Sequence, residues 1–127
     1  MKSFLAIFAM LITVSAFANA QNTDGVIDAL KQGNATKFST YLDEFVDIKL
    51  PQKDGIKNVG KTQAAITMKS FFEENGITGF DLTSQRELGG TMYITGKLHG
   101  NDRDYNLTIM LKDKGGSDAA VITVRIN

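Results

Sequence analysis

The chain of 127 residues has no cysteine, no tryptophan, one proline and one histidine. Without a thiol there is no disulfide, no thiolate metal ligand and no cysteine nucleophile. A zinc site would need mostly carboxylates, because His99 is the only imidazole. Basic and acidic residues balance at 14 each, and no basic run stands out, which argues against a nucleic-acid partner. We therefore predict no metal, no cofactor and no nucleic acid.

Residues 1–20 have the pattern of a bacterial signal peptide. Lys2 precedes an almost unbroken apolar run over residues 4–17, and the small residues at positions 18–20 suit signal peptidase. A membrane anchor is the alternative, but polar Gln21 follows at once. We expect residues 1–20 to be cleaved, leaving no membrane span. Residues 21–127 are then expected to form one domain in the periplasm or outside the cell.

Three amphipathic segments are predicted to be helices. The first begins with Asp24 as its N-cap and ends at Gly33, the second follows Asn34, and the third begins at Thr62 and ends at Gly76. The apolar positions that share a face are Val26, Ile27 and Leu30 in the first helix, Phe38, Tyr41, Leu42 and Phe45 in the second, and Ala65, Ile66, Met68, Phe71 and Phe72 in the third.

Period-two alternation predicts strands in the rest of the chain. Residues 46–50 and 56–59 read as a hairpin joined through Asp54 and Gly55. The later strands, at residues 80–88, 91–98, 104–112 and 119–126, are separated by short glycine-rich turns. They should form an antiparallel meander, because a parallel return needs a crossover of about a dozen residues. The predicted buried face carries Met92, Ile94, Leu98, Tyr105, Leu107, Ile109, Leu111, Ala120, Ile122, Val124 and Ile126, with Gly96 in phase.

This order of elements is that of the nuclear-transport-factor-2-like (cystatin-like) fold. The chain also resembles an uncharacterised family of small exported bacterial proteins, a domain of unknown function with that fold. The matching positions are Gly33, Asn34 and Ala35, residues 41–51, residues 71–75, Phe80 and Leu82, Tyr93, Gly96 and Leu98, and residues 111–116. The resemblance implies an α+β cone of order ααββαββββ, in which N-terminal helices and one covering helix pack on a bent antiparallel sheet. Its motifs are structural and imply no activity.

Residues 55–62 match the phosphate-loop pattern Gly-x-x-x-x-Gly-Lys-Thr, with a helix following. The surrounding sequence argues against nucleotide binding. A phosphate loop leaves a buried parallel strand, whereas Pro51 and polar residues precede the first glycine here. No later apolar run ends in an aspartate that could hold magnesium.

Ser84 and Arg86 are in phase with the apolar residues of their strand, which points them into the cone. An inward arginine is costly unless it is paired or faces water. One interpretation is a bulge near Gln85 that turns Arg86 to solvent. The other is a pocket in which Arg86 binds an acidic group of a ligand.

Tyr41, Phe72 and Tyr105 are further candidates to line such a pocket, although aromatic residues at regular spacing usually belong to the core. Asp47 is included because enzymes with the resembled fold use an inward aspartate or a Tyr/Asp/His set. His99 would need an orienting carboxylate for acid-base catalysis. We interpret the nearby residues Asp102 and Asp104 as turn residues.

These observations favour a non-enzymatic exported domain. It would bind a small apolar or amphipathic ligand in the cone, or a partner protein on the outer sheet face. A homodimer through the face that carries Tyr93, Thr95, Lys97, Thr108 and Met110 is one form of the second hypothesis. The alternative is a small cofactor-free isomerase or dehydratase built around Asp47 or Tyr41. We assign no catalytic residue, and the candidate ligand-binding residues are Arg86, Ser84, Tyr41, Asp47, Tyr105 and Phe72.

Overall fold

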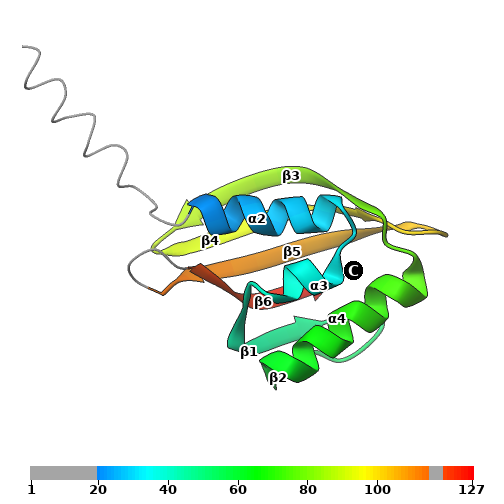
Figure 1. Cartoon of the computed structure of the whole chain (residues 1–127), viewed down its shortest axis with the longest axis horizontal. Coiled ribbons are helices and arrows are strands. Elements are labelled where there is room, and N and C mark those ends of the chain that lie inside the picture. Colours follow the sequence, from blue (N-terminus) through cyan, green and yellow to red (C-terminus); the bar gives the residue numbers. More distant parts are fainter. Residues whose placement is uncertain (1–19, 115–118) are drawn as a thin grey trace, which may run out of the picture.

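Figure 1 shows the computed structural model of the chain, which describes residues 20–114 and 119–127. The elements in chain order are α2 (Ala20–Lys31), α3 (Ala35–Ser39), β1 (Leu42–Lys49), β2 (Ile56–Gly60), α4 (Lys61–Asn75), β3 (Gly79–Leu88), β4 (Thr91–His99), β5 (Asp104–Asp113) and β6 (Ala119–Ile126). Residues 1–19, nearly all of the expected signal peptide, lie outside the described residues.

The described strands form one sheet in the order β2-β1-β6-β5-β4-β3. Strands β3 to β6 make the predicted antiparallel meander, and β1 and β2 make the predicted hairpin. However, β1 pairs with β6 in parallel, so the expected all-antiparallel sheet is wrong for this pair. The chain between β1 and β6 includes α4 and three strands, which supplies the long connection that a parallel pair requires.

All three described helices lie on one face of the sheet (Figure 1), which gives the α+β arrangement that the sequence predicts. Helix α2 packs on β3 and β6, whereas α4 packs on α3, β1 and β2. The helix that covers the meander is therefore α2. The Phe-rich helix α4 covers the β1–β2 end of the sheet instead.

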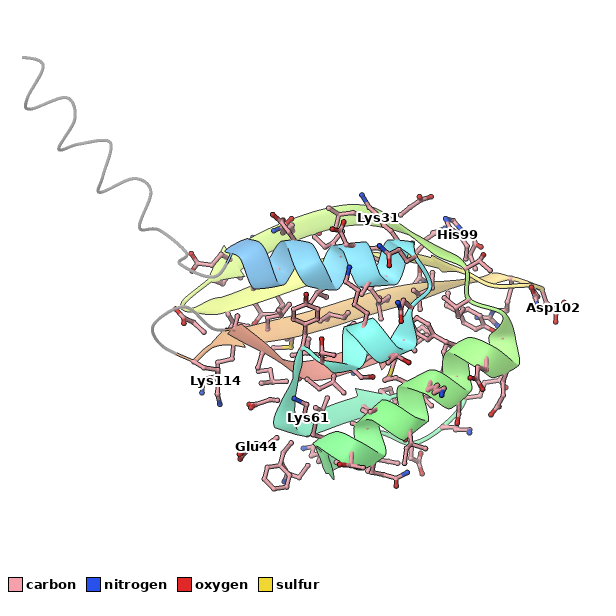
Figure 2. All side chains as sticks on the ribbon, viewed as in Figure 1. Lys31, Glu44, Lys61, His99, Asp102 and Lys114 are labelled. Atoms are coloured by element: carbon pink, nitrogen blue, oxygen red, sulfur yellow. The ribbon has the colours of Figure 1, made fainter. Side chains whose placement is uncertain are left out.

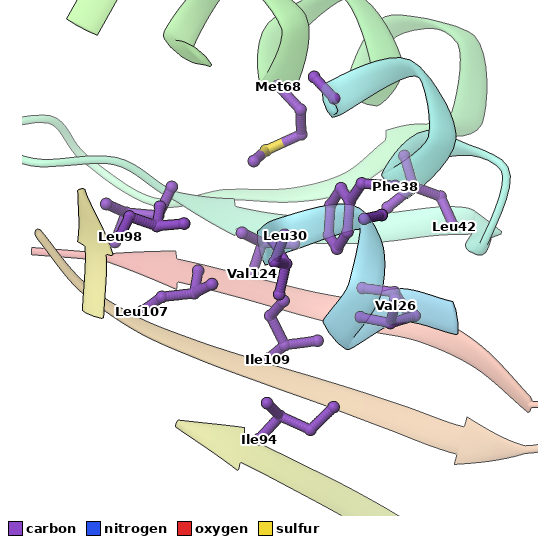
Figure 3. Packing of buried hydrophobic residues seen from close by; sticks show 14 of the residues in the cluster. Val26, Leu30, Phe38, Leu42, Met68, Ile94, Leu98, Leu107, Ile109 and Val124 are labelled. Atoms are coloured by element: carbon purple, nitrogen blue, oxygen red, sulfur yellow. The ribbon is translucent and has the colours of Figure 1, made fainter. Parts of the chain in front are cut away.

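One apolar core fills the space between the helices and the sheet (Figure 3). Side chains with no exposed surface come from every layer, and they include Val26, Leu30, Phe38, Met68, Ile94, Leu98, Ile109 and Val124. Each such side chain contributes about 1.5–3 kcal/mol through its removal from water. Among the described residues, Thr23 and Ser39 are the only buried polar side chains, and the Ser39 hydroxyl donates to the Ala35 carbonyl at 2.7 Å.

The predicted break between the first two helices is confirmed. Gly33 has φ +64°, and its N–H donates to the Leu30 carbonyl while the Asn34 N–H donates to the Ala29 carbonyl. This is the Schellman arrangement, which favours glycine at the left-handed position. Asn34 then caps α3, because its Oδ1 accepts the Lys37 N–H at 2.9 Å.

Three predicted helix boundaries are wrong. Helix α2 begins at Ala20, so Asp24 lies inside it and is not its cap. The N-cap of α4 is Gly60, which offers no side-chain hydrogen bond, and Thr62 lies in the first turn. Helix α3 ends at Ser39, and the chain then enters β1, where Phe45 is 59% exposed. The helical spacing up to Phe45 was misleading because a strand pairing with β6 competes successfully with the helix.

The buried face of α4 is also rotated from the prediction. Ala64, Met68, Phe71 and Phe72 are buried, whereas Ile66 is 53% exposed. Ala65 is only partly buried against the core. The contacts of α4 with α3 on one side and β1 on the other select this face.

A bulge in β6 changes which of its residues are buried. One extra residue, Ile122, interrupts the pairing with β5. Because a one-residue shift exchanges the two faces of a strand, the first half of β6 buries Ala119 and Val121. The prediction that Ala120 and Ile122 are buried is therefore wrong.

Gly96 in β4 is buried and in phase with the core, as predicted. An added Cβ would collide with the Asp81 carbonyl oxygen and lie 2.5 Å from Phe80 Cζ. The Phe80 ring of the neighbouring strand thus fills the place that a side chain at position 96 would take. A strand neighbour approaches here, and not a helix.

We expect Gly96→Ala to lower the free energy of unfolding by about 1–3 kcal/mol, because a backbone carbonyl and a packed ring must both move. Chemical denaturation measures this loss. Gly55→Ala is the matched control, since its added Cβ would lie 3.6 Å from Lys49 Cδ, an ordinary contact. Equal stability of the two variants would show that the Phe80 ring does not occupy this space.

Candidate functional site

A bulge in β3 determines where Ser84 and Arg86 point. Leu82 pairs with Gly96 and Ser84 pairs with Thr95, which leaves Thr83 as the extra residue. Beyond the bulge, Ser84 and Arg86 lie on the face of the sheet that carries no helix. Ser84 Oγ and Thr95 Oγ1 share a hydrogen bond at 2.6 Å, and Arg86 is exposed. The interpretation of a bulge that turns Arg86 to solvent is thus confirmed, with the extra residue at Thr83 and not near Gln85. The alternative prediction, that Arg86 points into a pocket inside the cone, is wrong.

Asp47 has a structural partner. In β2 the register shifts between Ile56 and Val59, and Asn58 adopts a positive φ of 56°. The Asn58 N–H is left without a strand partner by this irregularity, and it donates to Asp47 Oδ1 at 2.9 Å. Asp47 therefore lies on the helix-free side of β1 and satisfies a backbone group.

The three aromatic candidates lie on the other side of the sheet and do not meet at one point. Tyr41 packs against the backbone of α2 at Gly25, and Phe72 is a core residue with 4% of its surface exposed. The Tyr105 hydroxyl donates to Asn75 Oδ1 at 2.9 Å. Asp47 is thus separated from these tyrosines by the sheet itself.

His99 lies between two carboxylates that the sequence analysis did not connect to it. Its Nε2 is 3.0 Å from Asp81 Oδ2, and its Nδ1 is 3.1 Å from Asp104 Oδ1. Figure 2 places His99 toward the end of the sheet from which the β4–β5 turn with Asp102 projects. Asp104 faces His99 across the β4–β5 pair, so its interpretation as a turn residue is wrong. Hydrogen bonds that the His99 ring N–H groups donate to the carboxylates of Asp104 and then Asp81 raise the pKa of His99 above its ordinary value of 6.5.

The described His, Asp and Glu side chains include no group of three that could hold a metal ion. Each His99 nitrogen is already engaged by a carboxylate. The cluster links β3, β4 and β5 at one end of the sheet, and it contains the orienting carboxylate that a catalytic imidazole needs. It lies at the surface, with 37% of the His99 side chain exposed.

A groove of about 480 Å³ crosses the helix-free face near the β1–β2 hairpin. It is lined by Asp47, Ile48, Lys49, Gly55, Ile56, Lys57, Met110, Thr123, Val124 and Arg125. Met110 alternates with the buried residues of β5, so its apolar side chain lies on the helix-free face. Ile56 is 61% exposed, but it pairs with the buried Ile48 and so belongs to the helix side of the sheet. We call this hollow the sheet groove. Its volume falls within the range of about 300–1,000 Å³ that is typical of small-molecule sites.

Cations outnumber carboxylates in the sheet groove. Lys49, Lys57 and Arg125 line it, against Asp47 alone. Lys49 and Arg125 face each other directly in the β1–β6 pair, and like charges in this arrangement are destabilising. The sequence did not reveal the groove, because its lysines and arginine are distant along the chain and the parallel β1–β6 pairing was not predicted. The one indication in the sequence was that Lys49 alternates with Ile48 and Leu50, which places it on the outer face of its strand.

The fold is nuclear-transport-factor-2-like. A nuclear-transport-factor-2-like protein of unknown function from Cytophaga hutchinsonii is 13% identical with a TM-score of 0.57, covering 84% of this chain and 85% of that one. A ketosteroid isomerase-like protein from Parabacteroides distasonis is 16% identical with a TM-score of 0.59, covering 78% of each chain. Both similarities concern the fold alone.

The chain belongs to the DUF4783 family, a domain of unknown function, whose model matches residues 23–127. The crystal structure of a DUF4783 family protein from Bacteroides ovatus is similar, with 27% identity and a TM-score of 0.73 over 80% of this chain and 90% of that one. No curated protein matches the chain. Within the described residues, no helix is both long enough and apolar enough to cross a bilayer.

The carboxylate pair around His99 makes a pH-dependent contribution to stability. In the folded protein the pKa of His99 is raised above its ordinary value of 6.5. The contribution of the pairing to stability is therefore fully present below pH 6.5 and is lost as the pH rises through the folded-state pKa of His99. We expect the difference in thermal midpoint between the wild type and His99→Gln to be largest below pH 6.5 and to shrink above it. Imidazole NMR titration gives the pKa directly, and a difference that does not change with pH would contradict the pairing.

Proposed function

We propose that this protein is an exported, non-catalytic binding domain that holds a small amphipathic ligand in the sheet groove. The apolar core under the sheet supports this location most strongly. Buried apolar side chains pack where a cone-shaped cavity was expected, and the hollow between α4 and the β1–β2 hairpin has a volume of only about 170 Å³. The sheet groove on the helix-free face is larger and carries both apolar and charged groups. A ligand is therefore better accommodated outside the cone than inside it.

A larger hollow of about 530 Å³ lies between the α2–α3 turn and α4. It is lined mainly by turn residues, and its charged members Lys69 and Glu73 have opposite signs. The sheet groove instead combines apolar side chains with an excess of one charge, which suits it better to an amphipathic ligand.

The arrangement of the candidate residues gives less support to the isomerase or dehydratase alternative. Such an enzyme needs its acid and base to face one substrate. Asp47 lies on the helix-free side, and its Oδ1 accepts the Asn58 N–H, whereas Tyr41 lies on the helix side. The Tyr105 hydroxyl is engaged by Asn75.

Export is supported by the charged start, apolar run and small residues of positions 1–20. We expect protein recovered from the periplasm or medium of a Gram-negative host to begin at Gln21, as measured by intact mass. Ala18→Leu should block processing, because signal peptidase requires small residues at its recognition positions. A mature mass that includes residues 1–20 would contradict cleavage.

Native mass spectrometry of the mature protein, purified from its own envelope under mild conditions, tests the groove. We expect the wild type to carry a bound small molecule and Met110→Asp to lose it, because a carboxylate on the groove floor opposes apolar contact. Ile66→Asp is the matched control, since Ile66 is a 53% exposed residue of α4 outside the groove. Retention of the ligand by a folded Met110→Asp protein, or no bound molecule in any preparation, would reject the proposal. The same spectra report whether the protein is a dimer.

A further inference from the structure

The charges of the sheet groove indicate the kind of head group that it binds. Among the described residues, no hydrogen bond or ion pair engages the Lys57 ammonium or the Arg125 guanidinium. By contrast, Lys49 Nζ donates to the Leu50 carbonyl at 2.8 Å, and Asp47 accepts from the Asn58 N–H. Within residues 20–114 and 119–127, two cations of the groove therefore have no hydrogen-bond or ion-pair partner, while its one carboxylate accepts a hydrogen bond.

The floor of the groove is apolar in character. Met110 of β5 contributes its side chain directly. Lysine and arginine add the aliphatic parts of their side chains, because such residues cover apolar surface with their stems and keep their charges in water. The groove thus combines carbon surface with a cationic rim.

The packing of two cations side by side also suggests an anion. Lys49 and Arg125 are direct neighbours in the parallel β1–β6 pair, which costs stability in the absence of a compensating charge. An anion beside Arg125 would relieve that repulsion.

We propose that the sheet groove binds a single-chain amphipathic anion, with its acidic head held by Lys57 and Arg125 and its apolar chain lying on Met110 and the aliphatic stem of Lys49. This assignment rests on the proposed function, that the groove is a ligand site. Charge complementarity selects the anionic head. The limited volume of about 480 Å³ favours one small molecule over a membrane surface.

Dodecanoate, dodecyl maltoside and dodecyltrimethylammonium test the assignment, because they share one chain and differ in head-group charge. We expect isothermal titration below micelle-forming concentrations to give the tightest binding for dodecanoate. Raising the salt concentration should weaken the binding of dodecanoate and leave the binding of dodecyl maltoside unchanged, since salt screens only the charged head group. Amide chemical shifts should map the contact to the strands around Met110 and Arg125.

Three variants separate the charges. Arg125→Gln should weaken dodecanoate between about threefold and tenfold, as expected for one partly exposed charged contact. Asp47→Asn should tighten it about twofold to threefold, because it removes the repelling charge and retains an oxygen for the Asn58 N–H. Lys97→Gln is the matched control, because Lys97 lies on the same face but outside the groove. It should change the affinity for dodecanoate less than about twofold, since salt screens a distant charge.

The outcomes are distinguishable. If dodecyl maltoside binds as tightly as dodecanoate and maps to the groove, the proposed function stands and the head-group assignment is wrong. If none of the three probes changes the amide chemical shifts of the groove residues, the proposed function and the head-group assignment are both rejected. Arg125→Gln should also leave the thermal midpoint unchanged or raised, because it removes a like-charge neighbour of Lys49. A lowered midpoint together with weaker binding would assign Arg125 a structural role instead.

Discussion

The form of this sheet depends on where single extra residues interrupt its period-two alternation. Thr83 in β3, Ile122 in β6 and the irregular step at Asn58 in β2 each shift the register with a neighbouring strand. A bulge bends its strand, and it also exchanges the faces to which the following side chains point. The same interruptions therefore set the curvature under which the helices pack and decide which side chains reach the core.

The interruptions keep polar groups out of the interior. Without the extra residue in β3, Arg86 would follow Phe80 and Leu82 toward the core, where an unpaired guanidinium is costly. In β2 the interruption exposes the Asn58 N–H, and the carboxylate of Asp47 accepts it. The apolar core and the charged helix-free face are thus two results of one distribution of bulges. Asp47, around which the sequence analysis built its enzyme alternative, here accepts a hydrogen bond from the backbone.

The sequence predicts the strands well because their signals are local, namely alternation within each strand and glycine between strands. It predicts faces only as far as the register continues, which is why Ile122 was misassigned. The spacing of Leu42 and Phe45 is helical and predicts a helix, whereas the distant pairing of β1 with β6 makes this segment a strand. His99 and Asp104 could have been connected by closing the predicted turn between β4 and β5. The sheet groove could not, because it requires knowing that β1 and β6 lie side by side.

The balance of charge in the whole chain conceals its distribution in the fold. Cross-strand pairing and the lining of the sheet groove place on the helix-free face the cations Lys49, Lys57, Arg86, Lys97, Lys112 and Arg125, and the carboxylates Asp47, Asp81 and Asp104. His99 engages two of those carboxylates, which leaves the face basic although the chain has 14 residues of each sign. A two-fold dimer through this face would bring cations toward cations. Alternation in a sheet assigns charges to faces by odd and even position in each strand, so a sequence with balanced charges can still form a sheet with one basic face.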